Sequence, residues 1–442
     1  MERAISVRTI KTLSKQQTCD ALKWLGIVVG WVMVCFLLTC IFYVTTPYSA
    51  DQTAASCDSV DIQSAIDTCI STGGGTITLP ACSDDNTWTS TDKIDVDTST
   101  EIKIIGAGKT STVIGYADGE IPSAGAPGMY FKGGGLVELS NFTFRGSDTA
   151  NVAVGIRIYN NLTENLEIHD LKIQKFSNTA LYLCSNDAMA APTLVYNCEI
   201  GDQRGVGMYG IRLTGTGDNT DYVIPASFGT DNPNAVFIED NTFDDCYHST
   251  SSFGISNIVF RYNTITNPTS YLDGHGPCYD IGCNNDPGEP DAGTYIYEIY
   301  NNNIDCGSYP WGVNIRGGTG IMTDNTFTSC TISMRLEIEN CSEGTNCTDA
   351  NNCPMSYTVE GTDCFQSPDQ WWLWDNTTSG TAFATDGSEC IRACSGEEPT
   401  TANCEYILAA LSGYEKYTYP HPLRALEQRE FRGIGGANFN IN

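Results

Sequence analysis

The sequence predicts an all-β solenoid in which short strands stack coil upon coil behind one N-terminal helix. The first observation is a pattern that recurs four times between residues 236 and 337. In each copy apolar residues alternate around an asparagine, which is the period of a strand with one buried face. The copies read VFIEDNTF, IVFRYNTI, YEIYNNNI and IMTDNTFT, and their asparagines are Asn241, Asn263, Asn302 and Asn325.

The second observation is the spacing of these asparagines, which is 22, 39 and 23 residues. Two intervals match, and the third carries an insertion. Units this short cannot bury an apolar face alone, so they must stack on one another. Looser copies at residues 141–144, 170–173 and 197–200 place the start of the array before residue 140.

These repeats resemble those of the right-handed parallel β-helix proteins of the pectate-lyase-like superfamily. The resemblance implies a single-stranded right-handed parallel β-helix, in which the asparagine of one coil stacks on the asparagine of the next. The four asparagines would then be structural. We expect the β-helix to span residues 57–340 and a Cys-rich C-terminal cap and tail to span residues 341–442.

The first 56 residues predict a type II membrane anchor. Residues 24–44 carry no charged side chain and are long enough to cross a bilayer as a helix. Residues 1–23 carry five basic and two acidic side chains, which favours a cytoplasmic tail. We therefore expect a stalk at residues 45–56 and an extracellular or lumenal ectodomain. The alternative is a cleaved signal peptide and a secreted protein.

An amphipathic helix is predicted from Ser59, and three glycines at residues 73–75 end it. Its apolar face consists of Ile62, Ile66 and Ile70. In the resembling proteins such a helix covers the open end of the first coil, where unpaired strand edges would otherwise promote aggregation.

Composition limits the classes of partner. The chain has 20 cysteines, 17 of them after residue 45, which indicates an oxidising compartment with disulfides. Because 17 is odd, at least one thiol is free or pairs between chains, which leaves a homo-oligomer open. The net charge of −30 excludes nucleic acid and is compatible with neutral glycans or with a polyanion bridged by Ca²⁺. Five sequons allow N-glycosylation, at Asn141, Asn161, Asn340, Asn346 and Asn376.

Polar residues at matching offsets after the ladder asparagines predict a site. Equal positions on successive coils of a β-helix lie about 4.8 Å apart. Apolar residues alternate with the polar ones, so the polar side chains should point outward. The predicted catalytic residues are Asp273, His275, Arg316, Arg335 and Glu337. The predicted substrate-binding residues are Asn314, Tyr300 and Trp311.

Two chemistries fit this row, and the resemblance implies both. In polysaccharide lyases of similar fold an arginine removes the proton α to a uronate carboxylate, and here Arg316 or Arg335 would be that base. A Ca²⁺ ion would neutralise the carboxylate, held by acidic residues of the following loop, namely Asp280, Asp286, Glu289 and Asp291. In the related hydrolases two carboxylates act as acid and base, here Asp273 and Glu337.

A second polar row lies two residues before each asparagine and includes Glu239 and Arg261. We expect these two residues to pair across the sheet surface. Taken together, the sequence predicts a membrane-anchored protein that recognises and cleaves or remodels a surface polysaccharide, as a lyase or a glycoside hydrolase. The alternative is a non-catalytic rod for surface display or adhesion, because fold alone does not fix function.

Overall fold

The computed structural model describes residues 31, 33, 50–82, 88–120, 126–147, 154–159, 166–184, 193–202, 209–214, 228–231, 235–253, 257–274, 296–315, 318–336, 368–385 and 406–424. The predicted anchor at residues 24–44 and the cytoplasmic tail before it fall outside these ranges, apart from Trp31 and Met33. Among the residues described, no helix has the length and apolar character that a membrane span requires.

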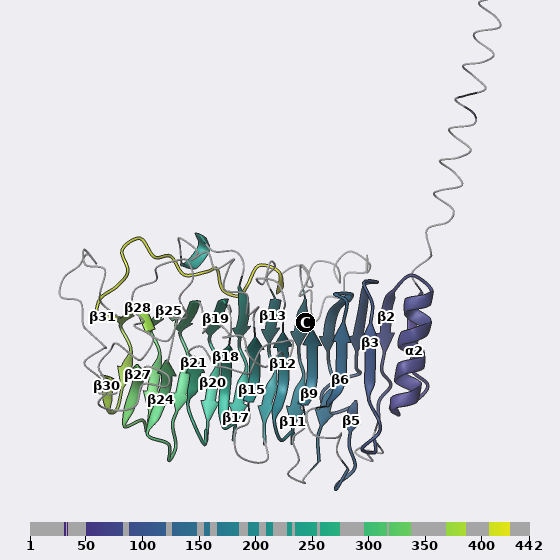
Figure 1. The fold of residues 1–442 in the computed structure, drawn as a ribbon, viewed down its shortest axis with the longest axis horizontal. Helices are drawn as coiled ribbons and strands as arrows, with labels where there is room; N and C mark the ends of the chain where they lie inside the picture. Colours follow the sequence, from purple (N-terminus) through teal and green to yellow (C-terminus); the bar gives the residue numbers. More distant parts are fainter. Residues whose placement is uncertain are drawn as a thin grey trace, which may run out of the picture. The chain divides into compact units, whose positions relative to one another are not determined.

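The described strands form three parallel sheets that run side by side along the molecule (Figure 1). The 12-stranded sheet contains β1 (Gln52–Thr53), β2 (Gly75–Thr78), β4 (Ile102–Ile105), β7 (Leu136–Ser140), β10 (Glu167–His169), β13 (Thr193–Tyr196), β16 (Val236–Glu239), β19 (Asn257–Arg261), β22 (Ile296–Tyr300), β25 (Gly318–Thr323), β28 (Pro368–Trp374) and β31 (Tyr406–Ile407). Strand β1 lies in the segment predicted to be a stalk, so the stacked sheet begins before residue 57.

The other two sheets take their strands from the same turns of the chain. The 10-stranded sheet contains β3 (Ile94–Asp97), β6 (Pro127–Lys132), β9 (Val154–Tyr159), β12 (Thr179–Cys184), β15 (Tyr209–Thr214), β18 (His248–Phe253), β21 (Leu272–Gly274), β24 (Trp311–Ile315), β27 (Ile332–Leu336) and β30 (Thr381–Thr385). The 9-stranded sheet contains β5 (Val113–Gly115), β8 (Thr143–Arg145), β11 (Lys172–Gln174), β14 (Glu199–Gly201), β17 (Thr242–Asp244), β20 (Thr264–Thr266), β23 (Asn303–Asp305), β26 (Thr326–Thr328) and β29 (Thr377–Thr378).

One continuous apolar core runs between the three sheets. Alternate residues of each strand enter it, and those at the same position of successive coils stack in register. In the 12-stranded sheet this inner row is Ile77, Ile104, Leu139, Ile168, Val195, Ile238, Phe260, Ile299, Met322 and Leu373. The predicted alternation of buried and outward residues is thereby confirmed.

The predicted asparagine ladder is present and fully connected. The Oδ1 atom of Asn263 accepts hydrogen bonds from the backbone N–H (2.9 Å) and the side-chain amide (3.1 Å) of Asn241. Asn302 accepts from Asn263 in the same way, and Asn325 accepts from Asn302. The ladder therefore satisfies buried backbone donors that would otherwise lack an acceptor.

The residue before each ladder position adopts a left-handed backbone conformation. Asp240, Tyr262, Asn301 and Asp324 have φ of 57°, 55°, 58° and 55°. Asn and Asp tolerate this region better than other non-glycine residues, which explains why three of these four residues are Asn or Asp. In earlier coils the ladder position itself is apolar, with Phe142, Leu171 and Cys198 buried there.

The β-helix continues past residue 340, where the sequence predicts its end. Strands β28, β29 and β30 add another coil in register, and Asn376 extends the ladder by accepting from the N–H of Asn325 (3.1 Å). The fully buried Trp371 fills the core at this end. Because the side-chain amide of Asn376 donates to the carbonyls of Met322 and Trp374, glycosylation of its sequon would disrupt the ladder.

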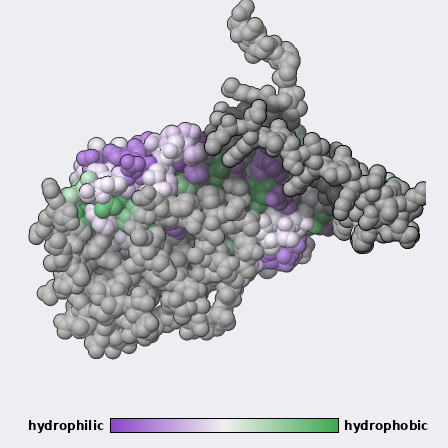
Figure 2. All heavy atoms as spheres, turned by 90° about the horizontal axis from the view of Figure 1, so that it is seen from above, coloured by the Kyte–Doolittle hydropathy of each residue, from purple (hydrophilic) through white to green (hydrophobic). Residues whose placement is uncertain are grey.

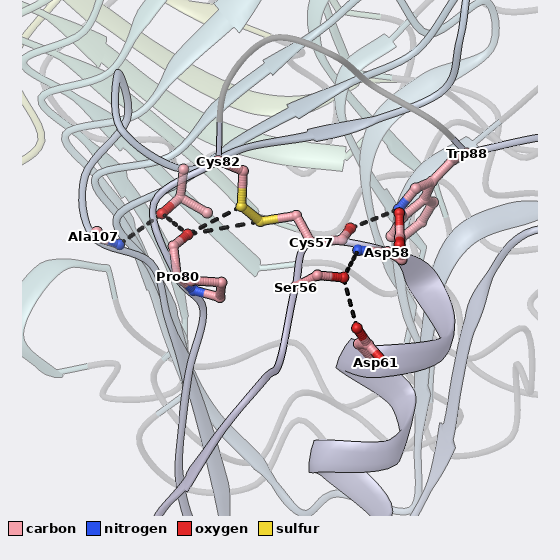
Figure 3. The surroundings of a disulfide bond; sticks show 9 residues. Ser56, Cys57, Asp58, Asp61, Pro80, Cys82, Trp88 and Ala107 are labelled. Atoms are coloured by element: carbon pink, nitrogen blue, oxygen red, sulfur yellow. Dashed lines mark hydrogen bonds between the residues drawn. A yellow bond between two sulfur atoms is a disulfide. The ribbon is translucent and has the colours of Figure 1, made fainter.

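Helix α2 (Ser59–Ser71) covers the first coil as predicted, with Ile62 and Ile66 buried. A disulfide between Cys57 and Cys82 ties the entry to this helix to the next turn of the chain (Figure 3). The indole N–H of Trp88 donates to the Cys57 carbonyl at 3.0 Å beside it. The aromatic ring and the disulfide thus fix the N-terminal end of the β-helix.

Six of the eight described cysteines are buried, and Cys57 and Cys82 are partly exposed. Cys306 and Cys330 form a second disulfide. Cys69, Cys198 and Cys246 are free and buried. Burial raises the pKa of the Cys198 thiol to about 12. A thiol that links two chains must be accessible, so these three cysteines do not support a homo-oligomer.

A C-terminal segment, residues 414–424, crosses the outer face of the 12-stranded sheet, and we call it the tail strap (Figure 1). Arg261 is fully buried beneath it and pairs with Glu239 at 2.6 Å. Its guanidinium also donates to the carbonyls of Tyr417 (2.9 Å) and Thr418 (3.0 Å). The expected pairing of Glu239 with Arg261 is confirmed, but its expected surface position is wrong because the strap covers it. Seen from above, the coloured surface carries both hydrophilic and hydrophobic patches (Figure 2).

Glu298 holds the strap at a second point. Its carboxylate accepts the hydroxyl hydrogen of Tyr414 (2.7 Å) and the N–H of Gly229 (2.8 Å). Burial is the largest influence on this carboxyl group and raises its pKa to about 7. The group is therefore protonated in the folded protein over a range where it is ionised in the unfolded chain.

Replacing Asn302 by alanine tests the ladder. The change leaves the N–H of Asn263 and the carbonyls of Phe260 and Tyr300 without their hydrogen-bond partner. We expect the free energy of unfolding in urea to fall by about 3 kcal/mol. The neighbouring exposed residue supplies the control, because Asn303→Ala should change this energy by about 0.5 kcal/mol at most. Equal effects of the two substitutions would contradict a ladder role.

Replacing Glu298 by glutamine tests the protonated carboxyl group. Stability from a raised carboxyl pKa is complete below the ordinary value and is lost as the pH rises through 7. Glutamine cannot ionise, so the variant should gain stability relative to the parent protein between pH 4 and pH 8, by up to about 3 kcal/mol in urea unfolding. The control is Glu167→Gln, on the same sheet and partly exposed, which also accepts from a tyrosine. The same pH dependence in both variants would refute the assignment.

Candidate functional site on the 10-stranded sheet

The three predicted site residues on adjacent described strands are in register. Asp273 on β21 pairs with Asn314 on β24, which pairs with Arg335 on β27. Their chain neighbours, such as Leu272 and Val313, belong to the core. Because successive side chains of a strand point to opposite faces, this row lies on the outer face of the 10-stranded sheet.

Exposure differs along this row. Asp273 and Asn314 are fully buried, whereas Arg335 is partly exposed. The Ser251 hydroxyl, one coil earlier, donates to the Asp273 carboxylate at 3.2 Å. The expectation that the whole row is solvent-exposed is therefore wrong for Asp273 and Asn314. Asp273 and Asn314 are therefore positioned to orient neighbouring side chains. Arg335, which is partly exposed, is the member of this row that a ligand could contact.

The remaining predicted residues divide into those that the structure leaves undescribed and those that it places. His275, Arg316 and Glu337 lie outside the described residues, and so do the four predicted Ca²⁺ ligands, Asp280, Asp286, Glu289 and Asp291. Within the ranges that the structure does describe, no three His, Cys, Asp or Glu side chains are grouped to hold a metal ion.

The predicted substrate-binding residues Tyr300 and Trp311 lie on different sheets. Tyr300 belongs to β22 of the 12-stranded sheet, is fully buried and accepts a hydrogen bond from Arg261 at 3.2 Å. It is thus inaccessible beneath the tail strap, and the prediction for Tyr300 is wrong. Trp311 belongs to β24 and is partly exposed beside the Asp273 row.

Aromatic rings accompany this row over four coils, and we call Tyr209, His248, Tyr271 and Trp311 the aromatic row. Their ring centroids are separated by 5.4, 4.8 and 5.7 Å in that order. The Arg335 guanidinium lies 4.2 Å from the Trp311 ring. The Nδ1–H of His248 donates to the Tyr271 carbonyl at 2.8 Å, which fixes the orientation of the imidazole. The result is a line of neighbouring rings beside polar groups.

Toward the N-terminus the outer row continues through residues that sequence reasoning missed. Arg212, Tyr182, Arg157 and Tyr130 precede Ser251 on successive coils, each in register with the next. The repeats GIRIY, ALYLC and GIRLT, which begin at residues 155, 180 and 210, carry the signal. The sequence analysis missed them because it located site residues by their distance from a ladder asparagine, and these coils have none.

The sign of the charge on this face differs from that of the whole chain. The sequence contains 23 basic and 53 acidic residues. Arg157, Arg212 and Arg335 nevertheless share one outer row, and each lies over an aromatic ring. Cation–π contact of this kind holds a guanidinium in place. The described part of this row thus carries three basic side chains in a protein whose net charge is negative.

No protein-family model matches the sequence, and no curated protein sequence is similar to it. Several solved structures have a similar course of the chain. The A-module of mannuronan C-5 epimerase AlgE4 from Azotobacter vinelandii has 14% identity, with 82% of this chain and 94% of that chain covered and a TM-score of 0.44. The PL6 family polysaccharide lyase Pedsa3628 from Pseudopedobacter saltans has 11% identity, with 86% and 89% covered and a TM-score of 0.37.

ORF18 of Geobacillus virus E2 has 13% identity and a TM-score of 0.42, and the match covers 80% of this chain but only 64% of that one. Likenesses at this level concern fold and assign no activity. The three parallel sheets and the ladder confirm the stacked parallel architecture expected from the sequence, and the described residues after residue 50 form a parallel β-helix.

Proposed function

We propose that the outer face of the 10-stranded sheet binds an anionic polysaccharide lengthwise and that the protein cleaves or remodels it near Asp273, Asn314 and Arg335. The observation that carries this proposal is the in-register row of Asp273, Asn314 and Arg335 beside the aromatic row. Residues 24–44 would anchor the protein, with this face on the extracellular or lumenal side, or a cleaved leader would release it.

The geometry suits a sugar chain in two respects. Successive coils lie about 4.8 Å apart, so one coil is available for roughly each sugar of an extended chain. Aromatic rings provide apolar surface with a polar edge, which suits the mixed faces of a sugar. The guanidinium fork of Arg335 matches a carboxylate in a bidentate manner.

The net charge of −30 does not prevent anion binding at this face. At physiological salt, charges farther away than about 8 Å are largely screened. A carboxylate that touches Arg335 is therefore influenced mainly by the guanidinium and by the groups beside it. The acidic remainder of the surface limits non-specific binding of polyanions.

In the lyase form of this proposal, Arg335 or Arg316 binds or deprotonates the uronate unit, and the Asp280–Asp291 loop would bind Ca²⁺. In the hydrolase form, Asp273 and Glu337 act as acid and base. The burial of Asp273 favours the lyase form, because a general acid must reach the glycosidic oxygen.

A non-catalytic rod is the second candidate function. The observation that favours it is the burial of Asp273 and Asn314, whereas Arg335 and Trp311 beside them are partly exposed. Such a face could hold a polysaccharide without cleaving it.

Substitution of Arg335 and Trp311 distinguishes the two functions. The full-length protein would be incubated with uronic and neutral polysaccharides, with and without Ca²⁺. Two signals would be followed in parallel, the absorbance of unsaturated uronates and the release of reducing ends. We expect Arg335→Ala to lower turnover by about 100-fold, because it removes the proposed base or carboxylate clamp. Trp311→Leu should weaken substrate binding by about ten-fold through lost ring contact.

Arg145→Ala is the matched control, since Arg145 pairs with Asp118 on the 9-stranded sheet. It should leave turnover unchanged. If Arg335→Ala retains full activity while Arg316→Ala abolishes it, the base is Arg316. No product from any polysaccharide, with binding retained, would establish the non-catalytic rod.

A further inference from the structure

The tail strap is anchored at its two ends by different kinds of titratable group. At its start, Tyr414 and the short 3₁₀ helix η2 (Gly229–Asp231) meet on the carboxyl group of Glu298, which belongs to β22. At its end, His421 packs against Phe237 on β16. Strand β19 separates β16 from β22 in the sheet, so the two anchors lie on different coils and each can open by itself.

The Glu298 anchor joins three segments of the chain. Glu298 is fully buried, and its carboxyl oxygens accept the Tyr414 hydroxyl hydrogen at 2.7 Å and the Gly229 N–H at 2.8 Å. The N–H of Thr230 donates to the carbonyl of Glu415 at 3.2 Å, which ties η2 to the strap. Opening this end would therefore lift η2 and the start of the strap and return the carboxyl group to water.

Ionisation of Glu298 opposes closure of this end. Burial is the largest influence and raises the pKa of the carboxyl group from its ordinary 4.5 to about 7, although Arg261 on β19 favours the ionised form. The closed end thus binds the proton more tightly than the open end. Closure is complete below pH 4.5 and weakens as the pH rises to 7. The other charged or titratable groups around this anchor are Tyr414, Tyr300 and the ion pair of Lys416 with Asp324.

The His421 anchor depends on a neutral imidazole. The ring centroid of His421 lies 4.3 Å from that of Phe237, and Nδ1 accepts the N–H of Leu423 at 3.3 Å. A protonated Nδ1 is a donor and cannot accept this hydrogen bond. Protonation of His421 would therefore remove a contact that holds the end of the strap.

The charges around His421 act in the same direction. Burial is the largest influence and lowers the pKa of the imidazole from its ordinary 6.5 to about 4. The guanidinium groups of Arg261 and Arg424 also disfavour the charged ring, whereas the carboxylate of Glu239 favours it. Arg424 is in addition paired with Asp240. Closure of this end is complete above pH 6.5 and weakens as the pH falls toward 4.

We propose that the tail strap is a pH-dependent cover of the 12-stranded sheet with two anchors of opposite response. Its start, at Glu298, loosens as the pH rises, and its end, at His421, loosens as the pH falls. The inference does not rest on the proposed function, because the strap covers the 12-stranded sheet and the proposed site lies on the 10-stranded sheet.

Amide hydrogen exchange of the full-length protein tests both anchors. Exchange would be followed by mass spectrometry between pH 5 and pH 8 and corrected for the intrinsic rate at each pH. The amides of Gly229 and Thr230 report on the Glu298 end. We expect their protection to fall by about 50-fold from pH 5 to pH 8. The amides of His421 and Leu423 report on the other end, and their protection should fall by about ten-fold from pH 7 to pH 5.

Substitutions assign each response to its group. Glu298→Gln should abolish the pH dependence at the Glu298 end and leave the response of the His421 end unchanged. His421→Gln should do the reverse, because glutamine keeps an acceptor and does not titrate. Glu199→Gln is the matched control, since it removes an exposed carboxylate on the 9-stranded sheet and should alter neither response.

A second variant serves each end if the glutamine variant fails to fold. Tyr414→Phe removes a hydrogen bond that favours the ionised form of Glu298, so the loss of protection at that end should move to higher pH. A purely structural role of Tyr414 would lower protection equally at every pH. His421→Phe keeps a ring on Phe237 and should remove the response at low pH.

Constant or rising protection of the Gly229 and Thr230 amides between pH 5 and pH 8 would overturn the inference. A response of the same direction at both ends would also overturn it. So would a fall in protection that persists unchanged in both Glu298→Gln and Tyr414→Phe, because another group would then control the start of the strap.

Discussion

The stacking of each coil directly on the next is the constraint on which the rest of this structure depends. Ladder asparagines enforce it, because each Oδ1 accepts both the backbone N–H and the amide of the preceding coil. A one-residue slip would leave buried donors unsatisfied and turn the apolar residues outward. With the register fixed, any residue type that recurs along the sequence becomes a row on the surface. The inner apolar stack and the outer arginine and aromatic rows are consequences of the same register.

Two of the three sheets use their outer faces differently. On the 12-stranded sheet the tail strap buries Glu239, Arg261 and Glu298, and each of these groups has hydrogen-bond partners that offset the loss of hydration. His421 of the strap packs on Phe237, and burial lowers its pKa to about 4. On the 10-stranded sheet the arginines lie over rings and remain partly exposed. One face is thus closed by the tail strap, whereas the other keeps partly exposed arginines among its described residues.

Counting from the ladder asparagines predicts a large part of the candidate site. It predicts that Asp273, Asn314 and Arg335 lie on one face, and the sheet register confirms this. The same count fails upstream, where Phe142, Leu171 and Cys198 occupy the ladder position and the repeats GIRIY, ALYLC and GIRLT have no reference point. Counting also predicts too early an end for the β-helix, because a long insertion separates Asn325 from Asn376, the next ladder asparagine.

The sequence by itself determined the local periods: strands that alternate, asparagines that recur once per coil, a capping helix, and therefore a stacked parallel β-helix. These features follow from interactions within one or two coils, which short sequence windows contain. Only the tertiary structure decided which outer residues are accessible. Tyr300 and Arg261 have the sequence pattern of exposed positions, yet a strap more than 100 residues later in the chain covers them. Burial by a distant segment does not change the alternating pattern of the covered strand, so the sequence of that strand could not reveal it.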